Sequence, residues 1–388
     1  MATSMDQNNG VLVIAIYSHP EYYPPVLSAL ENLAPLYKKI YVLHGNTKGF
    51  DWKYPDNIIL VGWGDPIAPA EVLVGSVLKK IGWFINFSRS FYSLVRKQDP
   101  DTILIYDYMP VLSYRLFSCL IRKPRILWYH NHDVADENQL RKYSLSWFAW
   151  KSEKWLFPKL NIFSLPAVER KTAFPMNLLK GEFIFLPNFP SVHIYSDLEQ
   201  NKDIPDKTIR LLFQGSIGTL HGLEEIIPLL RERINGHDLQ LILKGFISKE
   251  YAETLHKLAE SYSVTDRLIF IGPTGYAGVI QNAKTCDIGI GIHMKQDIMN
   301  RTLGTASNKI YEYAALGMPV LIYDNEHFRQ TLGKYSWVFF TDASETSLRK
   351  CLQDIVGNLG SLSAAARRDF EDFSYEKYFR EVADALSV

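Results

Sequence analysis

The stretch SNKIYEYAALGMPVL, residues 307–321, predicts a short helix that runs directly into a buried strand. Ser307 or Asn308 can cap the start of the helix, and Gly317 followed by Pro319 can end it. The residues after the proline are apolar without polar alternation, which is typical of a strand covered on both faces. A helix followed by such a strand is the repeating unit of an α/β sheet, so this stretch predicts the fold class.

The same pattern recurs along the whole chain. Short apolar or aromatic runs alternate with longer helical patterns, such as residues 222–234 and 249–264. The predicted strands are residues 11–17, 39–45, 57–63, 102–107, 125–130, 161–165, 183–188, 209–215, 239–245, 267–272, 286–292, 319–324 and 337–342. We therefore expect an α/β fold built from two Rossmann-like, doubly wound parallel-sheet domains.

The length of 388 residues and the 47% hydrophobic content suit two domains, each with its own core. Residues 186–208 contain three prolines and many polar side chains, which favours a linker and a domain boundary near residue 190. The predicted parts are residues 1–190, residues 191–362 and a closing amphipathic helix in 363–388. Two such domains predict a cleft, and ligands bind beyond the carboxyl ends of the strands.

Bulk properties exclude several classes of protein. The formal net charge is zero, so no overall field favours nucleic acid. The three cysteines lie far apart in apolar runs, which indicates buried free thiols in a reducing compartment and no zinc site. No apolar run reaches the roughly 20 residues of a membrane-spanning helix, and the N-terminus lacks a signal-peptide core. We expect a cytoplasmic protein, either soluble or peripherally bound to a membrane.

Two strand ends in the second half predict contacts with an anion. Gly215, Ser216 and Gly218 follow strand 209–215, where glycines allow a ligand to approach the backbone and a helix start favours negative charge. A simple tight turn is the structural alternative. Lys244 closes strand 239–245, and its ammonium group either reaches solvent or faces an anion in the cleft.

The helix of the opening stretch carries a third candidate contact. Its leading amides and Lys309 can stabilise a diphosphate. Glu312 lies one turn further on the same side, where its carboxylate can accept hydrogen bonds from ribose hydroxyls. The alternative is a Lys309–Glu312 surface ion pair, worth roughly a few tenths of a kcal/mol.

Taken in order, the motifs of the second half resemble the retaining glycosyltransferase family 4 of the GT-B fold, also called glycosyl transferases group 1. The matching pieces are LLFQGSIGTLHGLEEIIPLL, LQLILKG, DRLIFIGPTGYAGVIQNAKTCDIGIGI and SNKIYEYAALGMPVLI. The resemblance covers about residues 190 to 385, with looser matches at PKLNIFSLPAVER and FIFLPNFPS in the first domain. The tail FSYEKYF also resembles the family's closing helix, which implies that it crosses back to the first domain.

The resemblance implies a hexosyltransferase-like enzyme of class EC 2.4. It would move a sugar, with retention, from a nucleotide-diphosphate sugar to a glycan, lipid-linked or small-molecule acceptor in polysaccharide biosynthesis. No metal and no cofactor is expected.

The family's site residues carry over unevenly. Of its paired glutamates, the second matches Glu312, which is expected to hold the ribose, whereas the first falls on Gly304. Two loop positions that are often arginine and lysine are Ser216 and His221 here. The diphosphate charge is then expected to meet loop amides and cationic side chains. The donor-binding candidates are Gly215, Ser216, Gly218, Lys244, Arg301, Ser307, Asn308, Lys309 and Glu312.

The first domain supplies the other candidates. Strand 125–130 ends in His130, Asn131, His132 and Asp133, and either histidine can match the family's strand-end histidine, so both are catalytic candidates. A metal site and an ordinary polar loop are the alternatives. His19 and Glu21 follow the first strand and are candidate acceptor-binding residues. Asp99 and Asp101 in KQDPDTILIY are interpreted as turn residues rather than metal ligands.

Residues 76–97 combine basic and aromatic side chains in an amphipathic pattern. Such a helix can lie on an anionic bilayer, which predicts peripheral membrane contact, or its aromatic face can belong to the core. Two other functions share the same scaffold. One is a sugar-nucleotide epimerase, and the other is a degenerate, non-catalytic nucleotide-sugar binder, suggested by Gly304, Ser216 and His221.

Overall fold

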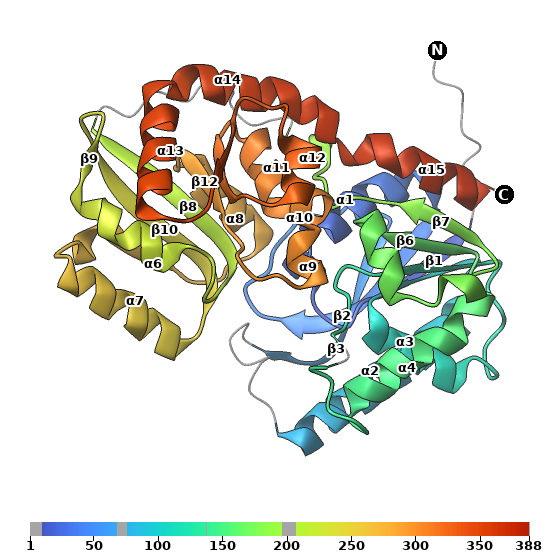
Figure 1. Cartoon of the computed structure of the whole chain (residues 1–388). Coiled ribbons are helices and arrows are strands. Elements are labelled where there is room, and N and C mark those ends of the chain that lie inside the picture. The colour runs from blue at the N-terminus through green and yellow to red at the C-terminus, as the bar shows by residue number, and fades with distance from the viewer. Residues whose placement is uncertain (1–9, 68–75, 137, 196–206, 388) are drawn as a thin grey trace, which may run out of the picture. The chain divides into compact units, whose positions relative to one another are not determined.

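The computed structural model describes residues 10–67, 76–136, 138–195 and 207–387. The chain divides into two compact units, Met1–Asn188 with Tyr375–Val388, and Phe189–Ser374. The middle of the predicted linker, residues 196–206, lies outside the described residues. Each unit contains one sheet with helices packed on it (Figure 1).

The first unit is built on a seven-stranded sheet in which all pairings are parallel. Its strands are β1 (Val11–Ala15), β2 (Lys39–Thr47), β3 (Ile58–Ile67), β4 (Thr102–Tyr106), β5 (Ile126–His130), β6 (Ile162–Leu165) and β7 (Glu182–Phe185). The order is β3-β2-β1-β4-β5-β6-β7, so the direction of winding reverses between β1 and β4. The loops that follow these two strands therefore diverge and leave room for a ligand.

Helices cover both faces of this sheet (Figure 1). They are α1 (Pro24–Leu33), α2 (Val77–Gln98), α3 (Tyr108–Phe117), α4 (Leu145–Leu156) and α15 (Tyr375–Ser387). Leu12 and Ile14 of β1 pack in the core formed with α1 and α15, whereas Val13 and Ala15 pack in the core formed with α2, α3 and α4. Because both faces are buried, the strands have no polar alternation.

The second unit repeats this design with strands β8 (Thr208–Ile217), β9 (Arg233–Ile234), β10 (His237–Ile247), β11 (Leu268–Ile271), β12 (Ile288–Gly291), β13 (Val320–Tyr323) and β14 (Val338–Thr341). The parallel order is β11-β10-β8-β12-β13-β14, and the short β9 pairs antiparallel with β10. Winding reverses between β8 and β12. All thirteen strands predicted from the sequence are confirmed, and β9 is the one that was missed.

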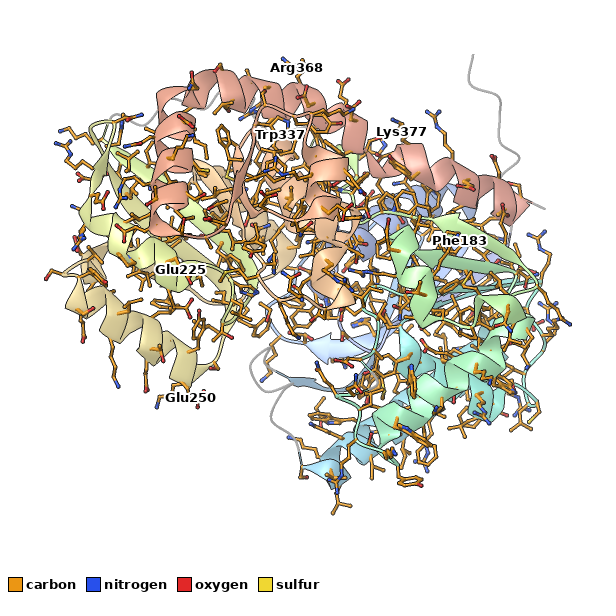
Figure 2. The ribbon with its side chains drawn as sticks, viewed as in Figure 1. Phe183, Glu225, Glu250, Trp337, Arg368 and Lys377 are labelled. Atoms are coloured by element: carbon orange, nitrogen blue, oxygen red, sulfur yellow. The ribbon has the colours of Figure 1, made fainter. Side chains whose placement is uncertain are left out.

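The helices of the second unit are α5 (Val192–Tyr195), α6 (Leu223–Ile226), α7 (Lys249–Ser261), α8 (Tyr276–Lys284), α9 (Ile298–Arg301), α10 (Leu303–Ala306), α11 (Asn308–Ala315), α12 (Glu326–Leu332), α13 (Glu345–Gly357) and α14 (Leu359–Asp369). Figure 2 shows how their side chains divide between the interior and the surface. Trp337 is fully buried in this unit, whereas Glu250 projects from α7 into solvent (Figure 2).

Three local predictions were wrong. The helix expected over 222–234 stops at Ile226 and continues as a 3-10 turn, because Pro228 has no N–H for the helical ladder. The closing helix begins only at Tyr375, after a separate turn. All three cysteines are free thiols as expected, but Cys119 is exposed rather than buried. Within the described ranges, no helix has the length and apolar character needed to cross a bilayer.

Candidate functional site

The start of α11 in the second unit forms a polar, buried corner. Ser307 occupies the N-cap position with an extended backbone, yet its hydroxyl makes no capping bond. This hydroxyl is buried and has no partner among the described residues. The first amides of a helix have no intrahelical acceptor and form its positive end. A buried hydroxyl beside such amides is an arrangement that suits an anion.

Glu312 is the centre of a buried hydrogen-bond network. Its Oε1 accepts from the Tyr276 hydroxyl at 2.8 Å and from Asn308 Nδ2 at 3.1 Å, and its Oε2 accepts from Gln214 Nε2. Burial raises the pKa of Glu312, while these hydrogen bonds and the Lys309 charge oppose the rise. Glu312 is only 2% exposed and forms no ion pair with Lys309, so the surface ion pair considered from the sequence is wrong.

Lys309 carries an ammonium group that lacks an anionic partner. Its Nζ lies 3.4 Å from Nε2 of His293 and 4.3 Å from the centre of the Phe213 ring. It makes no ion pair with any residue in the described ranges. Burial lowers the pKa of Lys309 to about 8, partly offset by the charge of Glu312. This ammonium group is therefore poorly solvated and available to an incoming anion.

The glycine-rich loop after β8 runs next to this ammonium. Gly215 has a φ of 113°, and a Cβ at this position would lie 3.5 Å from Nζ of Lys309. The backbone N–H of Gly218 donates to Nδ1 of His221 at 3.2 Å. The structure thus brings the predicted loop and Lys309 together. It also adds His293, which sequence reasoning missed although it follows directly on the predicted strand 286–292.

The first unit contains a pocket of about 250 Å³ at the point where its winding reverses. The lining residues are Ile16, Tyr17, Ser18, Tyr23, Tyr106, Asp107, Tyr108, Met109 and Asp133. They come from the ends of β1, β4 and β5 and from the loops that follow these strands. Four tyrosines and two carboxylates give this pocket flat apolar faces together with hydrogen-bond acceptors. This combination suits a hydroxyl-rich ring.

Asp107 and His132 form a fixed pair beside this pocket. Asp107 has a φ of 58° and a ψ of 172°, which is a strained conformation for a residue other than glycine. Its Oδ1 accepts from the backbone N–H of His132 at 2.7 Å, and its Oδ2 lies 3.3 Å from His132 Nδ1. The rings of Tyr23 and Tyr106 stack on His132, with centroid separations of 5.0 and 4.9 Å. Nε2 of His132 is buried and has no hydrogen-bond partner among the residues that the structure describes.

Solved structures share this two-unit fold. Sucrose-phosphate synthase from Thermosynechococcus elongatus matches with a TM-score of 0.66 and 12% identity, covering 97% of this chain and 98% of that chain. HepE from Anabaena, in complex with UDP-glucose, matches with a TM-score of 0.65 and 14% identity, covering 98% and 100%. A trehalose-6-phosphate synthase, from work on glycosyl transfer with retention, matches with a TM-score of 0.64 and 11% identity, covering 97% and 99%.

The family comparison decides the class of protein. Residues 196–358 match the family model described as glycosyl transferases group 1, so the second unit carries a group 1 domain. The chain has the GT-B fold, and its second unit carries a glycosyltransferase domain. No curated protein sequence gives a significant match.

Lys244 and Arg301 were also predicted as donor contacts in this glycosyltransferase. Their contacts differ from those of Lys309. Lys244 is 1% exposed, and its Nζ donates to the carbonyl of Gly272 at 2.5 Å. Arg301 is exposed at the end of α9, and its side chain forms no hydrogen bond or ion pair within the described part of the chain. Their contact with a donor stays a prediction.

Gly304 is held by neighbours on α11 and α12. Its N–H donates to Nδ1 of His327 at 3.0 Å, and its carbonyl accepts from the Tyr311 hydroxyl. A Cβ on Gly304 would lie 2.4 Å from His327 Nδ1 and 2.4 Å from Thr331 Oγ1. The position that matches the family's first glutamate therefore has no room for a side chain in this glycosyltransferase.

The second catalytic candidate, His130, lies next to His132, with ring centroids 4.6 Å apart. Its Nδ1 bonds the Ser164 hydroxyl at 2.8 Å, which also accepts from the indole of Trp128 at 2.7 Å. Burial, followed by the charges of His132 and Arg170, lowers the pKa of His130 well below its usual value. The described residues contain no group of three or more His, Cys, Asp or Glu side chains placed to hold a metal ion.

The two acceptor-binding candidates, His19 and Glu21, accept hydrogen bonds from backbone N–H groups and are not among the residues that line the pocket. Nδ1 of His19 accepts from the N–H of Glu21 at 3.3 Å, and Oε1 of Glu21 accepts from the N–H of Trp52 at 3.1 Å. Burial, followed by the charge of His44, lowers the pKa of His19 to about 3. Residues beside them in the same loop line the pocket, so the predicted loop is at the pocket but the predicted side chains are not among its lining residues.

Proposed function

We propose that this glycosyltransferase moves a sugar from a nucleotide-diphosphate sugar to a hydroxyl acceptor, with retention and without a metal, as a member of family 4. The observation that carries the proposal is the Lys309 ammonium. It is partly buried beside the glycine-rich loop, at the start of α11, and no acidic side chain among the described residues forms an ion pair with it. A poorly solvated cation next to free helix-start amides needs an anion, and a diphosphate supplies one.

Neighbouring groups suit the nucleoside part of such a donor. Oε1 of Gln214 is a buried acceptor without a partner. Glu312 uses three of about four acceptor positions on its carboxylate, so one remains for a ribose hydroxyl. These acceptors lie on the same network as Asn308, one residue from Lys309. The UDP-glucose complex of the structurally similar HepE supports a nucleotide sugar as the donor.

The chemistry requires breaking the bond between the anomeric carbon and the diphosphate oxygen. Negative charge then develops on the leaving diphosphate, where Lys309 and the helix-start amides stabilise it. These groups offer the charge that a divalent cation would otherwise supply. The tyrosine-lined pocket of the first unit is the proposed acceptor site, and Nε2 of His132 is the proposed contact for the reacting hydroxyl. Retention rests on the family resemblance and on the similarity to trehalose-6-phosphate synthase.

The donor site is tested by binding. UDP, GDP, ADP and CDP are titrated in thermal-shift and calorimetric assays, because a ligand specific for the folded state raises the melting temperature. We expect Lys309→Met to weaken the bound nucleotide by about 10- to 100-fold, as for a lost charge-assisted hydrogen bond. Lys257→Met, on the exposed surface of α7, is the matched control and should leave binding unchanged. Absence of binding by all four nucleotides would refute the donor site.

Product analysis separates the remaining functions. With a matching donor, a new anomeric linkage that forms only with acceptor present, in the presence of EDTA, supports metal-independent transfer. Conversion of the donor sugar without acceptor would instead support the epimerase. Binding without turnover of any acceptor would support the non-catalytic binder, for which the crowded Gly304 position is the favouring observation. The anomeric configuration of the product, read by NMR, decides between retention and inversion.

The exposed side chains at the start of α2 support a lipid-linked acceptor. Most of its predicted aromatic stripe is core, because Phe84, Phe87 and Phe91 are buried. The first turns instead expose aliphatic side chains, with Val77 at 69% and Leu78 at 81% exposed. The same exposed surface carries the side chains Lys79, Lys80, Ile81 and Ile85. We infer that this end of α2 contacts an anionic bilayer, as a lipid-linked acceptor in polysaccharide biosynthesis would require.

Vesicle flotation tests this contact. The protein should float with vesicles that contain 30% phosphatidylglycerol and not with pure phosphatidylcholine vesicles. Leu78→Glu should reduce the bound fraction by removing apolar burial and adding repulsion. Leu120→Glu, at an exposed leucine after α3, is the control. Equal flotation of the wild type with both vesicle types would contradict the inference. A cytoplasmic location, at the inner face of the membrane, stays a prediction.

A further inference from the structure

Three basic side chains from three separate elements meet where the winding of the second sheet reverses. His221 comes from the loop after β8, His293 from the loop after β12, and Lys309 from α11. The two imidazole rings lie 4.7 Å apart, and Nε2 of His293 lies 3.4 Å from Nζ of Lys309. The ring of Phe213 stacks on His221 at 4.8 Å and lies under the ammonium. We call these three side chains the basic cluster.

The hydrogen bonds indicate where each imidazole carries its proton. Nδ1 of His221 accepts from the N–H of Gly218, so a neutral His221 ring is protonated at Nε2. Nε2 of His293 faces an ammonium group, so a neutral His293 ring accepts there and is protonated at Nδ1. Each ring is thus held by one contact and keeps one N–H group for another partner.

The free protein disfavours charge on both rings. Burial, followed by the charge of Lys309, lowers the pKa of His221 to about 4 and that of His293 well below its usual value. The groups that act on these rings are Lys309 from α11, the partner histidine and the Gly218 amide. Glu312 acts on the cluster through Lys309. No carboxylate forms an ion pair with the cluster within the described ranges. The cluster therefore has a surplus of positive charge and suppressed imidazole protonation.

We propose that His221 and His293 belong to the diphosphate-binding site, and that they take up protons when a diphosphate binds beside Lys309. This inference rests on the proposed function and names two further residues of that site. A bound diphosphate cancels the charge of Lys309 and places negative charge next to both rings. Both changes favour the imidazolium form. The two histidines then become charged donors to the diphosphate and strengthen its binding.

The direction of the pH dependence of nucleotide binding follows from its coupling to proton uptake. Binding that takes up protons becomes tighter as the pH falls, by up to about tenfold per pH unit for each proton taken up. At pH 7.0 Lys309, with a pKa of about 8, is mostly charged in the free protein, so the uptake that disappears when both histidines are replaced is assigned to the histidines. If the rings of His221 and His293 only pack against their neighbours, nucleotide binding would take up no protons.

Calorimetry on the full chain tests the proposal. UDP is titrated at pH 7.0 in buffers of low and high ionisation enthalpy, such as PIPES and imidazole, and the difference in heat gives the number of protons taken up. GDP, ADP and CDP follow if UDP does not bind. We expect net uptake by the wild type, a loss of about half of it in His221→Gln and in His293→Gln, and none in the double variant. Glutamine keeps an N–H donor but does not titrate, so folding and hydrogen bonding are preserved.

His256→Gln, at an exposed position on α7, is the matched control and should keep the uptake of the wild type. Tight nucleotide binding without proton uptake would overturn this inference and leave the donor site standing. Uptake that is unchanged in the double variant would overturn it as well. Failure of all four nucleotides to bind at any pH would instead refute the proposed function itself.

Discussion

The two units place opposite chemistry at the same topological position. Where the first sheet reverses its winding, the loops supply four tyrosines and the carboxylates of Asp107 and Asp133. Where the second sheet reverses, the loops and α11 supply the basic cluster. The parallel sheet fixes where a ligand can bind, whereas the loop residues fix which charge it carries. The proposed anionic donor and the proposed hydroxyl-rich acceptor would need these two different surroundings.

The units also differ in how they hold a buried carboxylate. In the second unit Glu312 accepts hydrogen bonds from three side chains. In the first unit Glu153 of α4 is buried and accepts a hydrogen bond from the hydroxyl of Tyr129. Both carboxyl groups have a raised pKa because of burial, to about 8 in the case of Glu153. A well-bonded carboxylate supports its surroundings, whereas a poorly bonded one costs stability.

The largest effect is expected from Glu312→Ala. Three donors would lose their acceptor inside the second unit, which should cost about 3 kcal/mol of unfolding free energy or more. Glu312→Gln should cost clearly less, because an amide oxygen still accepts. Urea unfolding measures both, with Glu260→Ala on the exposed face of α7 as the control. Equal unfolding free energies for Glu312→Ala and the wild type would contradict the role of the network.

The next effect concerns the separation of roles between the units. Asp107→Asn should lower kcat by about 100-fold, because the amide no longer fixes the protonated Nδ1 of His132, while the affinity for the donor stays unchanged. Lys309→Met should lower donor affinity and kcat together, because its ammonium contacts the diphosphate both in the bound donor and as charge develops on it. Steady-state kinetics and nucleotide calorimetry measure the two effects. Asp51→Asn, at an exposed loop position of the first unit, serves as control. A comparable loss of donor affinity in Asp107→Asn would contradict the separation of roles between the two units.

A third effect is the alkaline limit of donor binding. The Lys309 ammonium has a pKa of about 8 in the free protein, and only its charged form attracts a diphosphate. Nucleotide affinity should therefore fall by about tenfold per pH unit above pH 8. In Lys309→Arg the decline should disappear up to pH 9.5, because a guanidinium stays charged. Calorimetric titration from pH 7.5 to 9.5 measures the profile, and parallel profiles for both proteins would assign the decline to another group.

The smallest effect tests the poorly bonded carboxyl of the first unit. Because the pKa of Glu153 is raised from 4.5 to about 8 on folding, its cost is absent below the unfolded pKa and grows as the pH rises to about 8. Glu153→Gln removes the charge and keeps an acceptor for Tyr129. The variant should melt at least about 2 °C above the wild type at pH 8, and together with it at pH 4.5. A gap in melting temperature that does not depend on pH would show that charge burial is not the cause.

The sequence was sufficient for the sheets because their strands are buried on both faces and therefore appear as unbroken apolar runs. It also placed Lys309 and Glu312 correctly on one short helix, and the structure brings Lys309 next to the glycine-rich loop. It missed His293 and Asp107, because their importance depends on residues far away in the chain, Lys309 and His132. The bond of Lys244 to a backbone carbonyl likewise depends on a side-chain direction that a strand pattern does not contain.

The packing of Gly304 also limits what protein engineering can achieve here. Restoring the family's glutamate by one substitution would drive its Cβ into His327 and Thr331, both closer than any real Cβ contact allows. The new carboxylate could enter only after α10 moves away from α12, which breaks the N–H bond that now joins them. A designer who wants that carboxylate in the donor site must therefore replace the α10–α12 contact as a unit, or introduce the acid from another element.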